Sequence, residues 1–289
     1  MTSRVGVVGL GIMGGAMAKN LLEAGHRVSG FDIEAGRADR LADNGLEIAR
    51  SVAEVAAGSD LVVLSLPTPA SLARVAGELA EAGRPGLVVL ECGTFSLEDK
   101  AAARDVLERA GIDLLDTPLS GTGLQAADAT LVVYASGSDD GLRAAEPVFS
   151  AIGRSTHLLG DFGNGTRMKF IANLLVAVNT LAAAEAHALG AAAGLDPAVV
   201  QETIADGVGS SKMFEIRGPM MVEDSYPAAA RLDTILKDAG IIASFARSLG
   251  VPTPLLEAAL PVYRQASQAG LGDLDAAALC RYLEQGEGK

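Results

Sequence analysis

The chain has 289 residues, of which 49% are hydrophobic and 20% are charged, and its formal net charge is −13. At about 150 residues per domain this length predicts two domains, and the composition is typical of a compact folded protein and excludes a disordered or fibrous one. The negative charge disfavours nucleic acid and anionic membrane surfaces as partners. The two cysteines and three histidines lack CxxC and HExxH spacing, so we expect neither a disulfide framework nor a metal site.

The first residues, MTSRVGVVGLG, lack the charged segment and cleavage site of a signal peptide, so we expect a cytoplasmic protein. Short apolar runs then alternate with alanine-rich helical patterns through the first 160 residues. Because nearly every position in these runs is apolar, we expect helices on both faces of a doubly wound parallel sheet. The predicted strands are RVGVVGL, HRVSGFD, DLVVLSLP, GLVVLECG, DLLDTPLS and TLVVYASG.

The first predicted strand runs directly into a G-x-G-x-x-G motif formed by Gly9, Gly11 and Gly14, and a helical pattern follows it. In a dinucleotide-binding Rossmann domain the three glycines permit a tight turn, close approach of a pyrophosphate, and packing of helix on strand. The N–H groups at the helix start bind the anion, so we assign Ile12 and Met13 to the cofactor site as well. The alternative is a glycine-rich turn that binds nothing.

Asp32 ends the second predicted strand, 23 residues after Gly9. A carboxylate at this place can accept hydrogen bonds from ribose hydroxyls and would repel a 2′-phosphate, so we expect NAD to be preferred over NADP. Arg37 and Arg40 follow closely. They could neutralise a phosphate or simply form the solvated face of the next helix, so NADP stays open.

Leu66 and Pro67 end one further predicted strand, and Thr94 directly follows another. Ligands of open α/β sheets bind at the carboxyl edge, so we assign these residues to the cofactor site. Ordinary turn chemistry is the alternative, because proline ends a strand in any fold.

The connection after another predicted strand contains Ser120, Gly121, Thr122 and Gly123. Hydroxyls and consecutive backbone N–H groups can form a small anion-binding concavity, which suits a substrate carboxylate. A flexible strand-to-helix connection that binds nothing is the alternative.

After Gly165 the strand signals stop and helical patterns continue to the end of the chain. We therefore predict a Rossmann domain over residues 1–163, an all-α domain over residues 164–289, and a cleft at their junction. Residues 170–184 form a stretch of 15 without charge, which is short for a membrane span and predicts a buried helix. The predicted helices are residues 166–193, PAVVQETIADG, AARLDTILKDAGIIASFARSLG, TPLLEAALPVYRQASQAG and DAAALCRYLEQ.

Of the six lysines, Lys169 alone opens an otherwise apolar helical pattern. Asn173 is four residues further on, so the two side chains share one face of the helix and could hold one substrate. Hydride transfer to or from a nicotinamide needs a proton acceptor or donor nearby, and Lys169 is the candidate general acid/base. The alternative is that Lys169 and Arg167 only extend to solvent from the end of a core helix.

Four segments together resemble the β-hydroxyacid dehydrogenases, the family that includes 3-hydroxyisobutyrate dehydrogenase and tartronate semialdehyde reductase. The resemblance covers almost the whole chain. Its segments, in the family's order, are GLGIMGGAMAKNLLEAGH, DTPLSGTGLQAADATL, GNGTRMKFIANLL and ILKDAGIIA.

The resemblance implies reversible hydride transfer between NAD(P) and the hydroxyl-bearing carbon of a small 3-hydroxy acid, giving a semialdehyde or keto acid. It implies that Lys169 is the catalytic acid/base and that a long helix packs subunits into dimers or tetramers. It also assigns substrate binding to Ser120, Gly121, Thr122 and Asn173, and a reach towards the cofactor and active site to Lys237 with Asp238.

The chain departs from the family pattern at three places: Thr122 replaces a second glycine, Ala129 replaces a glycine, and Gly93 replaces the serine that commonly precedes Thr94. The substrate is therefore open. Imine reductases share this scaffold but generally replace the lysine, so Lys169 favours alcohol or aldehyde chemistry. A catalytically silent dinucleotide-binding module remains the other alternative.

Overall fold

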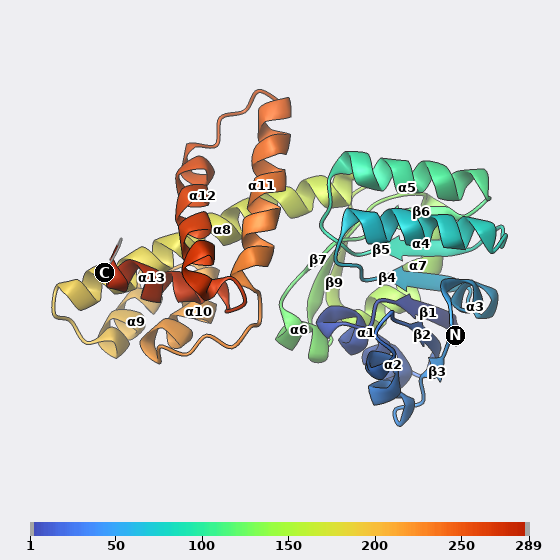
Figure 1. The fold of residues 1–289 in the computed structure, drawn as a ribbon, viewed down its shortest axis with the longest axis horizontal. Coiled ribbons are helices and arrows are strands. Elements are labelled where there is room, and N and C mark those ends of the chain that lie inside the picture. Colours follow the sequence, from blue (N-terminus) through green and yellow to red (C-terminus); the bar gives the residue numbers. More distant parts are fainter. Residues whose placement is uncertain (1–2, 287–289) are drawn as a thin grey trace. The chain divides into compact units, whose positions relative to one another are not determined.

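The computed structural model describes residues 3–286. The chain forms two compact units, Met1–Lys169 and Phe170–Lys289, called unit 1 and unit 2 below (Figure 1). Helix α8 (Asn164–Ala192) begins in unit 1 and continues through unit 2, and the boundary predicted from the sequence falls at its start.

Unit 1 contains a six-stranded sheet in the order β3-β2-β1-β4-β5-β6, with every pairing parallel. This arrangement confirms the doubly wound parallel sheet. Strand β3 was not predicted, because it contains only two residues and both are exposed. The strands are β1 (Arg4–Val8), β2 (Arg27–Phe31), β3 (Glu47–Ile48), β4 (Leu61–Leu64), β5 (Val88–Glu91) and β6 (Asp113–Asp116).

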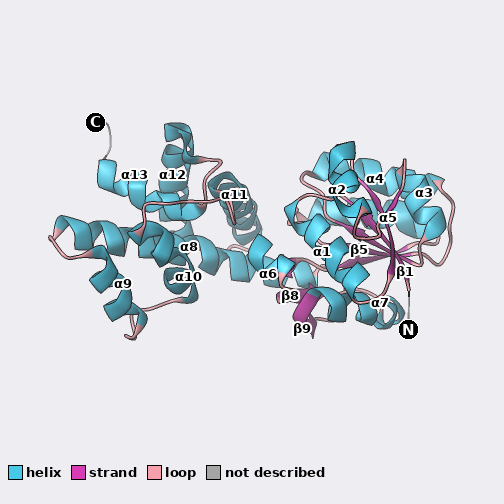
Figure 2. Cartoon of the chain, turned by 90° about the horizontal axis from the view of Figure 1, so that it is seen from below, coloured by secondary structure: helices cyan, strands magenta, loops and turns pink. Residues whose placement is uncertain are grey.

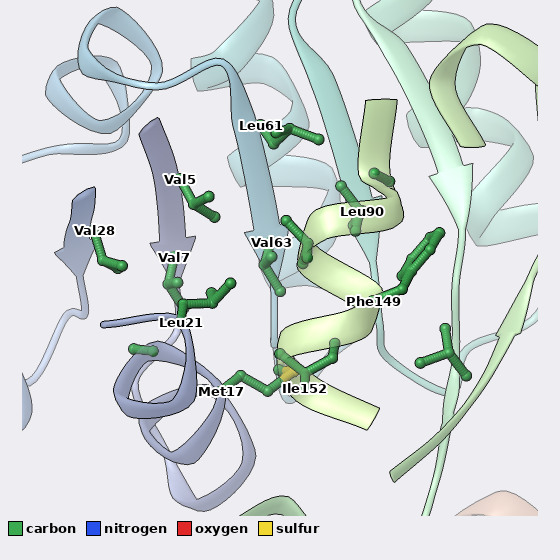
Figure 3. Packing of buried hydrophobic residues seen from close by; sticks show 14 of the residues in the cluster. Val5, Val7, Met17, Leu21, Val28, Leu61, Val63, Leu90, Phe149 and Ile152 are labelled. Carbon is green, nitrogen blue, oxygen red and sulfur yellow. The ribbon is translucent and has the colours of Figure 1, made fainter. Parts of the chain in front are cut away.

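Helices cover both faces of this sheet. On one face Val7 and Val63 pack with Met17 and Phe149, which lie on α1 and α7 (Figure 3). On the other face the alternate strand residues, such as Val62, pack with α3, α4 and α5. The near-continuous apolar strands follow from burial on both sides. The helices are α1 (Ile12–Glu23), α2 (Ala35–Ala42), α3 (Val52–Gly58), α4 (Pro69–Glu81), α5 (Leu97–Arg109) and α7 (Asp139–Ile152).

A second sheet in unit 1 has the order β7-β8-β9, from β7 (Leu119–Ser120), β8 (Leu131–Ala135) and β9 (Gly153–Leu158). Strand β7 pairs with β8 antiparallel, which differs from the all-parallel expectation. The connection, which holds α6 (Gly123–Ala127), is shorter than the dozen or so residues that a parallel crossover needs. Strand β9 was not predicted, because its sequence GRSTHL is mostly polar.

Unit 2 is helical, as expected (Figure 2). Helix α10 was not predicted, because Gly218 and Pro219 interrupt its apolar pattern. Besides α8, the helices are α9 (Pro197–Ala205), α10 (Lys212–Val222), α11 (Leu232–Ser248), α12 (Pro254–Ala266) and α13 (Leu279–Gln285), with short turns η1 (Ser267–Leu271) and η2 (Ala276–Ala278).

The expectation that residues 170–184 form a buried helix is only half right. They are helical, but Ile171 is 59% exposed and Leu175 is 54% exposed, whereas Phe170 and Ala177 are buried. Helix α8 is long and apolar enough to cross a membrane, by length and composition only, and 39% of its most apolar window is buried. The composition correctly predicted an apolar helix, but it did not indicate which face of the helix packs against the rest of the protein.

Candidate active site

The glycine motif forms the turn between β1 and α1. Gly9 has φ +90°, a conformation that favours glycine, and a side chain there would overlap the carbonyl oxygen of Ser65. A side chain at Gly14 would overlap the carbonyl oxygen of Gly9. At Gly11 a Cβ would meet only the tip of Arg37, at 3.7 Å, which is ordinary contact. Packing within the protein therefore requires glycine at positions 9 and 14, and a requirement at position 11 could come from a bound pyrophosphate.

Helix α1 begins at Ile12 with Gly11 as its N-cap, so the cap residue has no side chain to satisfy the first N–H groups. Ile12, Met13 and Gly14 make the first turn uncharged. Ile12 is 62% exposed. Backbone donors at such a helix start suit an anion, and these residues fit the pyrophosphate of NAD or NADP.

Asp32 links the end of β2 to the glycine loop. Its Oδ2 accepts a 2.7 Å hydrogen bond from the Leu10 N–H, and its Oδ1 accepts a 2.9 Å bond from the Glu34 N–H. Arg37 Nη1 lies 3.4 Å from Oδ2, whereas Arg40 is exposed. A carboxylate offers about four acceptor sites, so Asp32 retains capacity for ribose hydroxyls. Arg37 offsets part of the charge that would repel a 2′-phosphate.

Leu66 and Pro67 follow β4, and Thr94 follows β5. Strand β4 lies between β1 and β5, and all three are parallel. Because parallel strands end at the same edge, the structure brings these residues to the edge that carries Gly9 and Asp32.

The predicted substrate loop is only partly available to a ligand. Ser120 ends β7, and Gly121 and Thr122 follow it before α6 begins. The backbone N–H and the hydroxyl of Thr122 both donate to Gln125 Oε1, at 2.7 and 2.5 Å. The Thr122 hydroxyl proton therefore serves the start of α6, which leaves Ser120 as the better placed hydroxyl donor for a carboxylate.

Lys169 is half-buried in the second turn of α8. Residues at the ends of β6 and β8 hold the first turn of this helix. The Thr166 N–H and hydroxyl each donate a 2.7 Å hydrogen bond to Asp116, and the Gly165 N–H donates to Ser136 Oγ at 2.9 Å. Lys169 follows Thr166 by three residues, so its backbone position depends on this attachment.

Asn173 lies one turn further along α8 and contacts α11. Its Nδ2 donates a 2.9 Å hydrogen bond to Asp238 Oδ2, and Lys237 Nζ lies 3.1 Å from Asp238 Oδ1. With the amide NH₂ bonded to Asp238, the Asn173 carbonyl oxygen is an acceptor that can bind a donor group of a substrate.

Sequence reasoning missed a buried ion cluster of Glu91, Lys100 and Asp116. Lys100 Nζ lies 2.5 Å from Glu91 Oε2 and 2.7 Å from Asp116 Oδ1. All three side chains are completely buried. The signal that could have found them is an acid at the end of each of two apolar strands, since such ends are neighbours in a parallel sheet.

Burial and charge act in opposite directions within this cluster. Burial raises the pKa of Glu91 above its usual range and outweighs the opposing effect of Lys100. Burial alone lowers the pKa of Lys100, but Glu91 and Asp116 together raise it above its usual value. Lys100 is therefore a fixed cation, and Glu91 is the group that resists ionisation.

Among residues 3–286, no group of three or more His, Cys, Asp and Glu side chains is arranged to hold a metal ion.

Two family models match the chain. Residues 4–160 match the NAD-binding domain of 6-phosphogluconate dehydrogenase, and residues 163–283 match the NAD-binding model of NADP-dependent 3-hydroxyisobutyrate dehydrogenase.

Individual relatives match over nearly their full length. The chain is 35% identical to L-threonate dehydrogenase of Cupriavidus necator, over 97% of this chain and 96% of that protein. It is 30% identical to NAD-dependent L-serine dehydrogenase of Pseudomonas aeruginosa, over 99% of each. The crystal structure of 3-hydroxyisobutyrate dehydrogenase from Salmonella typhimurium matches with a TM-score of 0.90 and 33% identity, over 97% of this chain and all of that one. The chain thus belongs to the 3-hydroxyisobutyrate dehydrogenase family of NAD(P)-dependent β-hydroxyacid dehydrogenases.

Proposed function

We propose that this enzyme oxidises a small 3-hydroxy acid reversibly to its semialdehyde or keto acid with NAD or NADP. The observation that carries the proposal is the placement of Lys169 on α8, in a family whose named relatives are hydroxy-acid dehydrogenases. The relatives act on L-threonate, L-serine and 3-hydroxyisobutyrate by their names, so a carboxylate near a hydroxyl is the shared substrate chemistry.

In the proposed reaction, NAD(P) supplies the hydride acceptor or donor when it is bound. Lys169 Nζ takes the hydroxyl proton during oxidation and returns it to the carbonyl oxygen during reduction. Asn173, one turn from Lys169 on α8, helps to hold the substrate, and the Ser120 hydroxyl donates to the substrate carboxylate. One proton and one hydride leave the alcohol, which accounts for its two-electron oxidation.

Replacing Lys169 tests the proton transfer. Lys169→Ala should still bind NAD and should lower kcat about 10²–10⁴-fold, the range for a lost acid/base group. The matched control is Lys212→Ala, because Lys212 is an exposed lysine paired with Glu215 on α10. Turnover by Lys169→Ala equal to that of the control would refute the assignment.

The substrate class is tested by measuring turnover of a panel of C3 to C6 hydroxy acids. The change in nicotinamide absorbance reports turnover with each cofactor. Turnover of a 3-hydroxy acid supports the proposal. Turnover of cyclic imines alone would favour the imine reductase alternative, and cofactor binding without turnover of either class would favour a silent binding module.

We propose that NAD is preferred because Asp32 faces the ribose. Asp32→Asn keeps one oxygen for the loop and removes the charge, so the preference for NAD over NADP should fall. Arg37→Gln removes the cation beside Asp32 and should raise that preference. Equal changes for both cofactors in both variants would contradict this role of Asp32.

We also propose a homo-oligomer that buries the apolar stripe of α8. The stripe consists of Met168, Ile171, Leu175 and Leu189, which are 37%, 59%, 54% and 72% exposed. Their spacing is that of the a and d positions of a heptad, which suits packing of a helix against a second copy. Leu175→Glu should yield monomers in light scattering after gel filtration. Leu249→Glu, at an exposed leucine outside the stripe, is the control.

We propose that the protein is cytoplasmic. Cys92 and Cys280 are free thiols, as is usual in a reducing compartment. Cell fractionation with cytoplasmic and exported marker proteins tests it.

A further inference from the structure

The buried cluster of Glu91, Lys100 and Asp116 joins two strands and a helix through charged side chains. Two carboxylates share one ammonium, and none of the three side chains touches solvent. A buried ion pair is often no more stabilising than apolar side chains of the same volume, because desolvation offsets the attraction. Such a cluster fixes the orientation of the groups bound to it, because a charged acceptor holds its hydrogen-bond donors at defined angles.

The cluster holds two segments that the proposed function uses. At one end, Glu91 Oε1 accepts a 2.7 Å hydrogen bond from the Gly93 N–H, in the turn that leads to the predicted cofactor residue Thr94. At the other end, Asp116 accepts both 2.7 Å bonds from Thr166 in the first turn of α8. Lys100 bridges the two carboxylates.

The bonds to Thr166 fix the start of α8 both in rotation and along its axis. The N–H and the hydroxyl of Thr166 reach the two different oxygens of one carboxylate. Lys100 holds that carboxylate in turn, so it cannot follow Thr166 if the helix rotates. Lys169 follows by three residues, which is slightly less than one helical turn.

We propose that Asp116, fixed by Lys100, is a positioning residue that sets the location of the Lys169 amine through Thr166. This inference rests on the proposed function, since it assigns Lys169 the proton transfer. Asp116 does not itself touch the reacting atoms in this scheme. A displacement of about 1 Å in a catalytic group can cost roughly 10²-fold in rate, so the attachment affects turnover far more than binding.

Three single substitutions test the proposal. Thr166→Val has nearly the same shape as threonine and removes the hydroxyl bond to Asp116. Thr166→Ser keeps that bond. Thr117→Val is the matched control, because Thr117 is also completely buried but donates its hydroxyl to the Glu91 backbone carbonyl and not to α8.

Thr166→Val should lower kcat roughly 10- to 100-fold while the Kd for NAD, measured by calorimetry, stays within about twofold. Thr166→Ser should restore most of the turnover, and Thr117→Val should keep it. A merely structural role would lower the melting temperature of both valine variants and leave their kcat values alike. Equal kcat values in Thr166→Val and Thr117→Val, or no rescue by serine, would overturn the proposal.

Hydrogen exchange gives a readout that does not need turnover. In Thr166→Val the peptide that spans residues 164–170 should exchange faster than in the wild type, and in Thr117→Val it should not. Unchanged exchange in Thr166→Val would overturn the positioning inference. If the wild type turns over no hydroxy acid with either cofactor, the proposed function fails, and the exchange result still decides whether Asp116 holds the start of α8.

Discussion

Units 1 and 2 each bury a cation with carboxylate partners, but they balance the charge differently. In unit 2, Arg217 Nε lies 3.0 Å from Asp275 Oδ1, and its Nη1 donates to Thr180 Oγ1 at 2.7 Å. Asp275 also accepts from the Ala230 and Ala277 N–H groups, at 2.8 and 3.0 Å. One guanidinium thus meets one carboxylate, and backbone donors satisfy the rest.

In unit 1 one ammonium meets two carboxylates, so one acid is in excess. Burial raises the pKa of Glu91, and Asp116 keeps spare acceptor capacity, which holds Thr166. A balanced pair is sufficient to tie helices together, as in unit 2. An unbalanced one retains acceptors that can hold a further segment, here the helix that carries Lys169.

The largest expected effect comes from removing the cations. Lys100→Met leaves two buried carboxylates without their shared partner and should lower the free energy of unfolding by about 3–5 kcal/mol, the usual range for breaking a buried pair. Arg217→Met should cost less, because Asp275 keeps its backbone donors. Urea denaturation of both variants measures the two losses, and a larger loss for Arg217→Met would reverse the comparison.

The second effect is the response of unit 1 to rising pH. The folded pKa of Glu91 is raised above 4.5, so the folded state binds more protons than the unfolded state, and stability falls as the pH rises from about 4.5 through the folded pKa. Glu91→Gln removes this loss, so the wild type should lose stability relative to the variant as the pH rises above about 4.5. Denaturation at each pH measures this difference, and Glu146→Gln, at an exposed position on α7, is the control.

Unit 2 should respond to pH in the opposite direction. His187 is buried against Phe214, and burial lowers its pKa below 6.5. The folded state therefore binds fewer protons, and stability present above about pH 6.5 is lost as the pH falls through the folded pKa. His187→Gln should remove this acid-side loss in melting curves between pH 7 and 5. The same substitution at the exposed His157 should leave it unchanged.

The smallest effects are expected at two matched helix caps. Ser96 starts α5, which carries Lys100, and Ser211 starts α10, which carries Arg217; each hydroxyl accepts a 3.1 Å backbone hydrogen bond. Alanine at either position should cost about 1 kcal/mol by denaturation. Ser96→Ala should also lower kcat if the position of Lys100 matters for Lys169, whereas Ser211→Ala should leave kcat unchanged.

Local patterns in the sequence were sufficient for much of the fold and of the candidate site. The strand, Gly9 and the helix after it are adjacent in the chain, so their turn chemistry is readable directly. Lys169 and Asn173 are four residues apart in one helix. Strand β9 was not predicted because its residues are mostly polar. Helix α10 was not predicted because Gly218 and Pro219 interrupt its helical pattern.

By itself, the sequence determined the parallel α/β unit, the helical second unit, the glycine loop and the position of Lys169 in a helix, because each depends on neighbours within a few residues. Tertiary structure alone decided that Lys100 meets Glu91 and Asp116 and that Asp116 meets Thr166, 50 residues away. Side chains from different strands and helices meet only after the strands have paired, and the sequence carries no periodic signal for the distances between them. The same reason explains why the exposed face of α8 could not be read from its apolar composition.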